Sequence, residues 1–345
     1  MRARARVADA LARRVITAVA AGSFVVILLV FAFVFREAVP FFFPPEPVST
    51  AGEAAGGEQE TYGEAQETYG SDPSAPPGSS GSGLEMSIAG EDAGVNDLLR
   101  TRWEPVSEEP KYGLLPLILG SFKVSLIAVL LAAPLAILAA LYTSTIAPRW
   151  AKEVMKPTIE ILAGFPSVVI GFFALITLAT FFQESFGFEY RLNAFVGGTA
   201  LALAVLPIVY TLTEDALSTV PASFTDASLA LGASRWQTAL FVVLPAATPG
   251  VYASVILGIG RAFGETMIVL MATGNAALFS ADPFVPVRTM SATIGAEMAE
   301  VVFGDTHYNI LFLIGALLFV FTFSLNAFAE FVVRRQLLKK FGGGP

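Results

Sequence analysis

Two charged side chains, Arg261 and Glu265, lie within an apolar stretch that is long enough to cross a membrane. A charge at the centre of a membrane helix costs about 2.5–3.5 kcal/mol on insertion scales, so its default interpretation is functional. Because they are four residues apart, the two side chains share one helix face and partly neutralise each other. A guanidinium donates two parallel hydrogen bonds to an oxyanion, and we therefore predict that Arg261, Glu265 and Thr266 line an anion pathway. The alternative is an ion pair that only joins helices.

Glycine and proline residues near these charges predict close packing and a broken helix. Gly260 and Gly264 form a Gly-x3-Gly pair, which lets another helix approach closely. Earlier in the chain, Gly164, Pro166 and Ser167 interrupt an apolar run. Proline removes a backbone donor, so we expect the helix to bend or break there. Such breaks often line the pathway in transporters, but they also occur as tolerated kinks, and the sequence leaves both interpretations open.

A short segment between two apolar stretches has the pattern of a capped helix. Ser223-Phe224-Thr225-Asp226 fits a capping box, in which a hydroxyl caps the helix and an acid lies three residues on. A helix is predicted to run through to Leu231, and Gly232 can adopt the left-handed conformation that ends it. A short apolar helix in water needs a groove on a partner, although an ordinary turn is the alternative. The residues expected to contact that partner are Asp226, Ala227, Ser228, Leu229, Gly232, Arg235 and Trp236.

The composition is that of a membrane protein. The chain has 345 residues, of which 54% are hydrophobic and 14% charged, whereas about a quarter of the residues in a soluble domain are charged. Cysteine is absent and His307 is the single histidine, which excludes disulfides, thiolate metal sites and histidine-rich metal sites. No nucleophile–base pair is visible, so an enzyme is not expected. Acidic residues between Arg36 and Lys111 account for the net charge of −8, and no nucleic-acid signal follows from it.

The apolar runs predict an all-α polytopic protein with six transmembrane helices, because a bilayer takes roughly 20 apolar residues per helix. We expect spans near residues 15–35, 114–142, 159–182, 195–213, 239–273 and 309–333. The first run is longer than the about 7–15 residues of a signal peptide. Basic residues such as Arg149, Lys152 and Lys156 mark a cytoplasmic turn, and the same bias places both termini in the cytoplasm.

Four regions follow from these spans. Residues 1–35 form a cytoplasmic N-terminus and the first helix, and residues 36–112 lie outside the cytoplasm. Within the latter, an acidic insertion at about 46–97 is poor in aliphatic residues and is therefore expected to be disordered. Residues 113–333 form a core of five transmembrane helices with a cytoplasmic loop at about 214–245. Residues 334–345 form a basic cytoplasmic tail.

The cytoplasmic loop resembles the EAA loop of the permease subunits of bacterial ABC importers, Glu-Ala-Ala-x3-Gly-x9-Ile-x-Leu-Pro. This chain reads Asp226-Ala227-Ser228-x3-Gly232-x9-Val242-x-Leu244-Pro245, with the same spacing and three mild substitutions. The run Gly260-Arg261-Ala262-x-Gly264-Glu265-Thr266-Met267 and the run Ile159-Glu160-Ile161-Leu162-Ala163-Gly164-x-Pro166-Ser167 resemble the PstC family of phosphate importer permeases. The resemblance covers roughly residues 103–333, while the acidic insertion is unlike the usual short connection.

The resemblance implies a type I ABC importer permease in the bacterial cytoplasmic membrane, surrounded by lipid. A sister permease, PstA, would complete the pathway, a PstB dimer would hydrolyse ATP, and the binding protein PstS would deliver phosphate. In that family the Arg and Glu of the motif that holds Arg261 and Glu265 are important for transport, and the EAA loop forms the helix held by the ATPase.

No Gly-x4-Gly-Lys-Ser/Thr loop occurs in the sequence, so ATP and Mg would be bound by the partner and this chain would hold no cofactor. Three alternatives stay open. The substrate of an importer could be another oxyanion, such as sulfate or molybdate. The chain could be an ion-coupled secondary transporter that uses Arg261 and Glu265 as a relay. It could also be a membrane sensor or scaffold.

Overall fold

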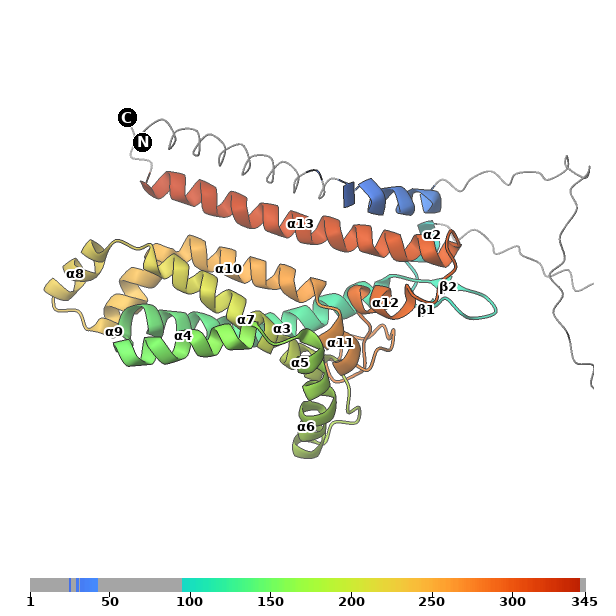
Figure 1. Cartoon of the computed structure of the whole chain (residues 1–345), viewed down its shortest axis with the longest axis horizontal. Helices are drawn as coiled ribbons and strands as arrows, with labels where there is room; N and C mark the ends of the chain where they lie inside the picture. Colours follow the sequence, from blue (N-terminus) through green and yellow to red (C-terminus); the bar gives the residue numbers. More distant parts are fainter. Residues whose placement is uncertain (1–24, 26–28, 31, 43–94, 342–345) are drawn as a thin grey trace, which may run out of the picture.

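Apolar helices make up most of the structure and run along its long axis (Figure 1). The computed structural model describes residues 25, 29–30, 32–42 and 95–341, without the side chains of residues 95–96 and 332–341. Among these residues, five helical stretches are long and apolar enough to cross a membrane: Leu115–Ile146, Ser167–Phe186, Ala194–Ser218, Arg235–Gly264 and Thr306–Phe331. The predicted all-α, membrane-spanning fold class is confirmed.

The elements are joined mostly by short connections. In chain order they are α2 (Val95–Leu98), β1 (Trp103–Glu104), β2 (Lys111–Tyr112), α3 (Leu115–Leu141), the π-helical turn η1 (Tyr142–Ile146), α4 (Arg149–Ala163), α5 (Ser167–Phe173), the π-helical turn η2 (Ala174–Leu178), α6 (Ala179–Phe186), α7 (Ala194–Ser218), α8 (Ala222–Ala230), α9 (Arg235–Thr238), the π-helical turn η3 (Ala239–Val243), α10 (Leu244–Gly264), α11 (Met267–Ala272), α12 (Met290–Glu297) and α13 (Thr306–Phe341). The strands β1 and β2 pair as a small antiparallel hairpin.

Only part of the predicted first span is described. Residues 32–42 are helical and lie against α13, where the ring centroids of Phe33 and Phe312 are 5.7 Å apart. Most of the first span, nearly all of the acidic insertion and residues 342–345 lie outside the described residues, so the count of six spans stays a prediction. The helix α13 continues through the predicted tail as far as Phe341.

The helices α3 and α7 form the centre of the bundle and pack closely through small side chains. Ala128, Ala132 and Ala136 recur at every fourth position of α3 and are almost fully buried, because this spacing places them on one helix face. A Cβ added to Gly198 of α7 would lie 2.6 Å from Ile127 Cγ2. Helix α10 packs against α3, α7 and α13, so three neighbours fix the position of its side chains.

The third predicted span is divided into two helices, which corrects its bounds. We predicted one span over residues 159–182, but α4 ends at Ala163 and a new helix begins at Ser167. Pro166 has an extended backbone, with φ −59° and ψ 135°, and a proline also disfavours the helical conformation of the residue before it. The second helix then turns away from the long axis and forms the projection labelled α6 (Figure 1).

Helix α4 lies along α7 and contains the basic residues that we had placed in a turn. Arg149, Lys152 and Lys156 all belong to this helix. Lys156 Nζ is 2.7 Å from Glu214 Oε1 on α7, and this hydrogen bond raises the pKa of Lys156. The contact ties the amphipathic α4 to the end of α7.

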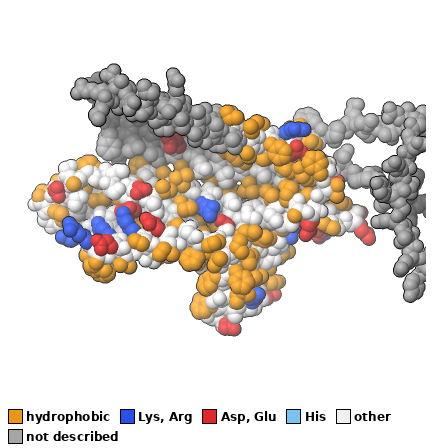
Figure 2. Space-filling model, in the orientation of Figure 1, with side chains coloured by type: hydrophobic (Ala, Val, Ile, Leu, Met, Phe, Trp, Pro, Cys, Tyr) orange, Lys and Arg blue, Asp and Glu red, His pale blue; other side chains and the backbone are white. Residues whose placement is uncertain are grey.

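The two ends of the bundle carry different elements. The helices α8 and α9, the start of α4 and the end of α13 lie at one end, and α2, the hairpin and α12 lie at the other (Figure 1). On the face drawn in Figure 2, basic and acidic side chains gather at the end with α4, α8 and α9, and hydrophobic side chains cover much of the α6 projection. All segments that we predicted to be cytoplasmic and that the structure describes lie at one end. That this end faces the cytoplasm stays a prediction.

Candidate functional site

Arg261 and Glu265 lie at the point where α10 ends, which corrects the expectation that both belong to one continuous helix. Helix α10 ends at Gly264, and the backbone of Glu265 is extended, with φ −73° and ψ 128°. Glycine favours such an end because it stabilises a helix poorly. The carbonyl of Glu265 accepts a hydrogen bond from the hydroxyl of Ser291 on α12, at 2.7 Å. This hydrogen bond links the extended backbone that follows α10 to α12.

The two charges form the predicted pair across this helix end, but their surroundings differ. Arg261 Nη2 lies 3.4 Å from Glu265 Oε2, and the side chains are 52% and 6% exposed, respectively. The carboxylate is held inside the protein, while the guanidinium projects from it. A group placed in this way can pair with Glu265 and still present N–H donors to a further anion.

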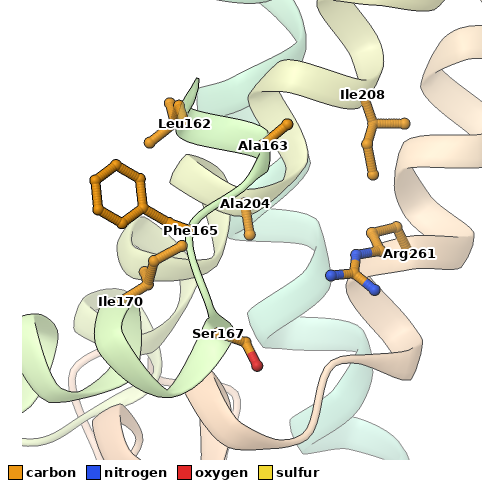
Figure 3. A pocket seen from close by; sticks show the side chains of 8 residues that line it. All are labelled: Leu162, Ala163, Phe165, Ser167, Ile170, Ala204, Ile208 and Arg261. Carbon is orange, nitrogen blue, oxygen red and sulfur yellow. The ribbon is translucent and has the colours of Figure 1, made fainter. Parts of the chain in front are cut away.

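Arg261 borders two cavities. The first has a volume of about 160 Å³ and is lined by Leu162, Ala163, Phe165, Ser167, Ile170, Ala204, Ile208 and Arg261. The second has a volume of about 510 Å³ and is lined by Ile208, Leu212, Leu257, Gly260, Arg261, Gly264, Thr322 and Asn326. Arg261 is the only charged residue among those that line either cavity. Figure 3 shows its guanidinium directed into the first cavity, toward the hydroxyl of Ser167.

The glycine pair of α10 has two different environments. A Cβ at Gly260 would lie 3.2 Å from Asn326 Oδ1 of α13, so this glycine permits a close approach of the two helices. A Cβ at Gly264 would meet no atom within 4 Å, and Gly264 lines the second cavity. The close approach of a helix is therefore seen within this chain at Gly260, and for Gly264 it stays a prediction.

Thr266 lies apart from both cavities. A Cβ added to Gly295 of α12 would be 2.5 Å from Thr266 Cγ2, so Thr266 packs against α12. Thr266 lines neither of the two cavities, and its role as a pathway residue stays a prediction. Gly164 and Pro166 provide the break between α4 and α5 and so place Ser167 at the first cavity.

The segment predicted to bind a partner forms an exposed helix. Helix α8 begins at Ala222, directly after Pro221, and no side chain caps it, so the predicted capping box at Ser223 is wrong. Proline supplies the φ angle that suits a helix start, and the helix begins earlier than we expected. The capping box lies instead at α9, where Ser234 and Gln237 bond each other's backbone N–H groups at 2.8 and 3.3 Å. Gly232 has a φ of +89°, in the left-handed region that ends the helix.

No residue of α8 is buried, and apolar side chains stand out from this end of the protein. Leu231 is 90% exposed and Trp236 is 53% exposed. The remaining predicted contact residues, Asp226, Ala227, Ser228, Leu229 and Arg235, belong to the same two short helices. The hydroxyls of Ser228 and Thr238 are 2.9 Å apart and join α8 to the end of α9. Helices α8 and α9 therefore form an exposed surface with both apolar and polar side chains, and its contact with a partner stays a prediction.

A polar cluster at the opposite end was not predicted from the sequence. Glu297 accepts hydrogen bonds from Trp103 Nε1 at 3.1 and 3.2 Å, and its Oε2 lies 3.0 Å from His307 Nε2. It also pairs with Arg288. Burial, followed by the charge of Asp305, raises the pKa of Tyr112 beside this cluster. No group of three or more His, Cys, Asp or Glu side chains that could hold a metal ion occurs in the described part of the chain.

Two further cavity residues, Thr322 and Asn326 of α13, were also missed. The signal that could have found Asn326 is an amide in an otherwise apolar membrane helix, which by default marks a pathway or a helix contact.

Known proteins resemble this chain over most of its described length. Residues 132–337 match the family described as "Binding-protein-dependent transport system inner membrane component". The probable ABC transporter permease protein YqgH of Bacillus subtilis is 38% identical over 256 residues, which cover 74% of this chain and 82% of that protein. The phosphate transport system permease protein PstC of Mesorhizobium japonicum is 33% identical over 261 residues, which cover 70% of this chain and 79% of that protein.

Among solved structures, a chain of the MetNI methionine ABC transporter in an inward-facing conformation is 18% identical to this one, with a TM-score of 0.49. The match covers 65% of this chain and 94% of that chain. The matched family covers more than half of the chain, and the PstC relatives match it over most of their length. The chain is therefore a multi-pass protein of the bacterial inner membrane that belongs to the binding-protein-dependent transport system inner membrane component family and, within it, to the PstC permeases.

Proposed function

We propose that this chain is a permease subunit of an ATP-driven importer of inorganic phosphate. It forms the translocation pathway with a sister permease of the PstA type. A separate PstB-type ATPase dimer supplies the energy, and a PstS-type binding protein delivers the substrate. The proposal is supported by the family membership and by relatives whose names describe phosphate transport system permeases.

The observation that carries the proposal is the position of Arg261 between two cavities whose linings contain no other charge. The wall of the first cavity is mostly aliphatic or aromatic, and a charge-assisted hydrogen bond is stronger in such surroundings than in water. An oxyanion that enters either cavity meets one fixed guanidinium. Glu265 pairs with the same guanidinium and so limits how strongly Arg261 retains the anion.

The exposed helix α8 supports the part of the proposal in which a separate ATPase supplies the energy. None of the nine residues of α8 is buried, and its apolar side chains Phe224 and Leu229 are exposed, so a groove on a partner could cover them. The EAA spacing matches the loop by which permeases of this family meet their ATPase. The chain binds no nucleotide through a phosphate-binding loop, so ATP hydrolysis belongs to the partner chain.

The test is phosphate uptake by the complete complex, reconstituted in vesicles, with Arg261→Gln. We expect uptake to fall by about 100-fold or more, because each hydrogen bond to a charged group contributes about 1.5–3 kcal/mol and glutamine removes the charge. The matched control is Arg100→Gln, since Arg100 is 61% exposed and pairs with Asp97 at the far end of the bundle. Its uptake should stay close to that of the unchanged complex.

Three results would contradict the proposal. Normal uptake by an assembled Arg261→Gln complex would remove the pathway role of this residue. Preferential uptake of sulfate or molybdate by the unchanged complex would show another oxyanion as substrate. Uptake by the permeases without the ATPase would show a secondary transporter.

A further inference from the structure

The cavity of about 160 Å³ has two polar side chains in its lining, Arg261 and Ser167. They come from α10 and from the start of α5, and Figure 3 shows the guanidinium extending into the space between these two elements, with the Ser167 hydroxyl at the lower edge of that space. We propose that this cavity is an oxyanion site in which the Ser167 hydroxyl donates a hydrogen bond to the anion held by Arg261. The proposal rests on the proposed function and extends it by naming a second ligand.

The break in the third span is what makes the Ser167 hydroxyl available. Hydroxyls within helices usually bond a carbonyl three or four residues earlier. Thr180, Thr199 and Ser324 all do so, at 2.9, 2.8 and 2.6 Å. Ser167 is the first residue of its helix, so the residues three and four positions earlier lie beyond the break at Pro166. Among the described residues, its hydroxyl has no hydrogen-bond partner.

The size and lining of the cavity suit a small tetrahedral oxyanion. Its volume of about 160 Å³ is close to that of an engineered cavity of about 150 Å³ that holds a benzene molecule. The other lining residues are aliphatic or aromatic, apart from backbone groups. A fixed guanidinium on one wall and a free hydroxyl on the other can therefore bind one anion from two sides.

The substitution Ser167→Ala can separate a role in binding the anion from a role in holding the start of α5. Pro166 is the N-cap of this helix and no side chain caps it, so Ser167→Ala removes the hydroxyl without removing a cap. Alanine is also a favourable residue within a helix. The substitution should therefore leave the assembly of the complex unchanged.

The experiment compares Ser167→Ala, Ser167→Thr and Ser324→Ala in the complete complex in vesicles. Inorganic phosphate uptake and ATP hydrolysis are measured in the same preparation, per assembled complex. We expect Ser167→Ala to lower the uptake rate at phosphate concentrations below saturation by about 10-fold or more, since a hydrogen bond to the bound anion is lost and the anion binds more weakly. The number of ATP molecules hydrolysed per phosphate should rise, because the partner ATPase still works. Ser167→Thr should restore at least half of the lost rate, because it retains the hydroxyl.

Ser324→Ala is the matched control, because its hydroxyl lies on an exposed face of α13 and bonds its own helix at 2.6 Å. The assignment is overturned if Ser167→Ala imports phosphate within twofold of the unchanged complex, if threonine does not rescue it, or if Ser324→Ala shows the same loss. A normal Ser167→Ala together with an inactive Arg261→Gln rejects only the role of Ser167. Normal uptake by Arg261→Gln rejects the proposed function as well.

Discussion

At the scale of the residue, the pair of Arg261 and Glu265 combines a buried anion with an accessible cation. Glu265 is 6% exposed and Arg261 is 52% exposed, so a ligand reaches the guanidinium but not the carboxylate. Solvent around the exposed guanidinium weakens its attraction to the carboxylate. In the proposed pathway, the carboxylate would therefore orient Arg261 and lower its affinity for a further anion without cancelling it.

We predict from this arrangement that Glu265→Gln slows phosphate import. Without the carboxylate, Arg261 retains the anion longer, and the maximal uptake rate should fall by roughly threefold to tenfold, which corresponds to a screened charge interaction of about 1 kcal/mol. The measurement is uptake per assembled complex. Glu184→Gln on the exposed α6 is the control and should import normally. An unchanged rate in Glu265→Gln would show that the carboxylate has no part in release.

At the scale of the element, the apolar spans could be predicted from the sequence, and the breaks only in part. The bounds of α3 and α7 follow from runs of apolar residues, because the signal for a membrane helix is local. The end of α10 at Gly264 was not predictable in this way. The extended backbone there accepts a hydrogen bond from Ser291 at the carbonyl of Glu265, and Ser291 belongs to a helix that begins after a long loop. The first cavity could not be predicted either, since Ser167 and Arg261 are far apart in sequence.

The exposed end of α8 gives a prediction at the same scale. Gly232 has a φ of +89° and no atom within 4 Å of an added Cβ, so Gly232→Val strains the backbone by about 1–2 kcal/mol without a clash. We expect this strain to change the surface that we propose as the contact with the ATPase. Uptake should fall at least fivefold while ATP hydrolysis continues, measured as ATP hydrolysed per phosphate imported.

Gly187 offers a matched control for that experiment. It ends α6 with a φ of +69°, and a Cβ there would also meet no atom within 4 Å. Gly187→Val therefore introduces the same kind of strain away from α8, and its ratio of ATP to phosphate should stay unchanged. Equal ratios in the two variants would remove the coupling role of α8.

At the scale of the whole molecule, Glu297 joins segments that are distant in sequence. Its carboxylate binds Trp103 of β1, Arg288 of the loop before α12 and His307 of α13. The Glu297 side chain is 14% exposed, so most of these contacts are shielded from water. The position of α12, whose Ser291 binds the backbone of Glu265, therefore depends on a cluster at the opposite end of the bundle from α8.

We predict that Glu297→Gln destabilises this end of the protein. Removing one partner of a fully buried ion pair costs about 3–5 kcal/mol, and partial exposure reduces the expected cost to about 1–3 kcal/mol. The melting temperature of the purified complex should fall by several degrees, at roughly 2–4 °C per kcal/mol. Glu300→Gln is the matched control, because Glu300 is exposed three residues further on, and it should melt like the unchanged protein. Because α12 holds Glu265 in place, Glu297→Gln should also slow uptake below the melting temperature, whereas equal melting of the two variants would show that the cluster does not stabilise the fold.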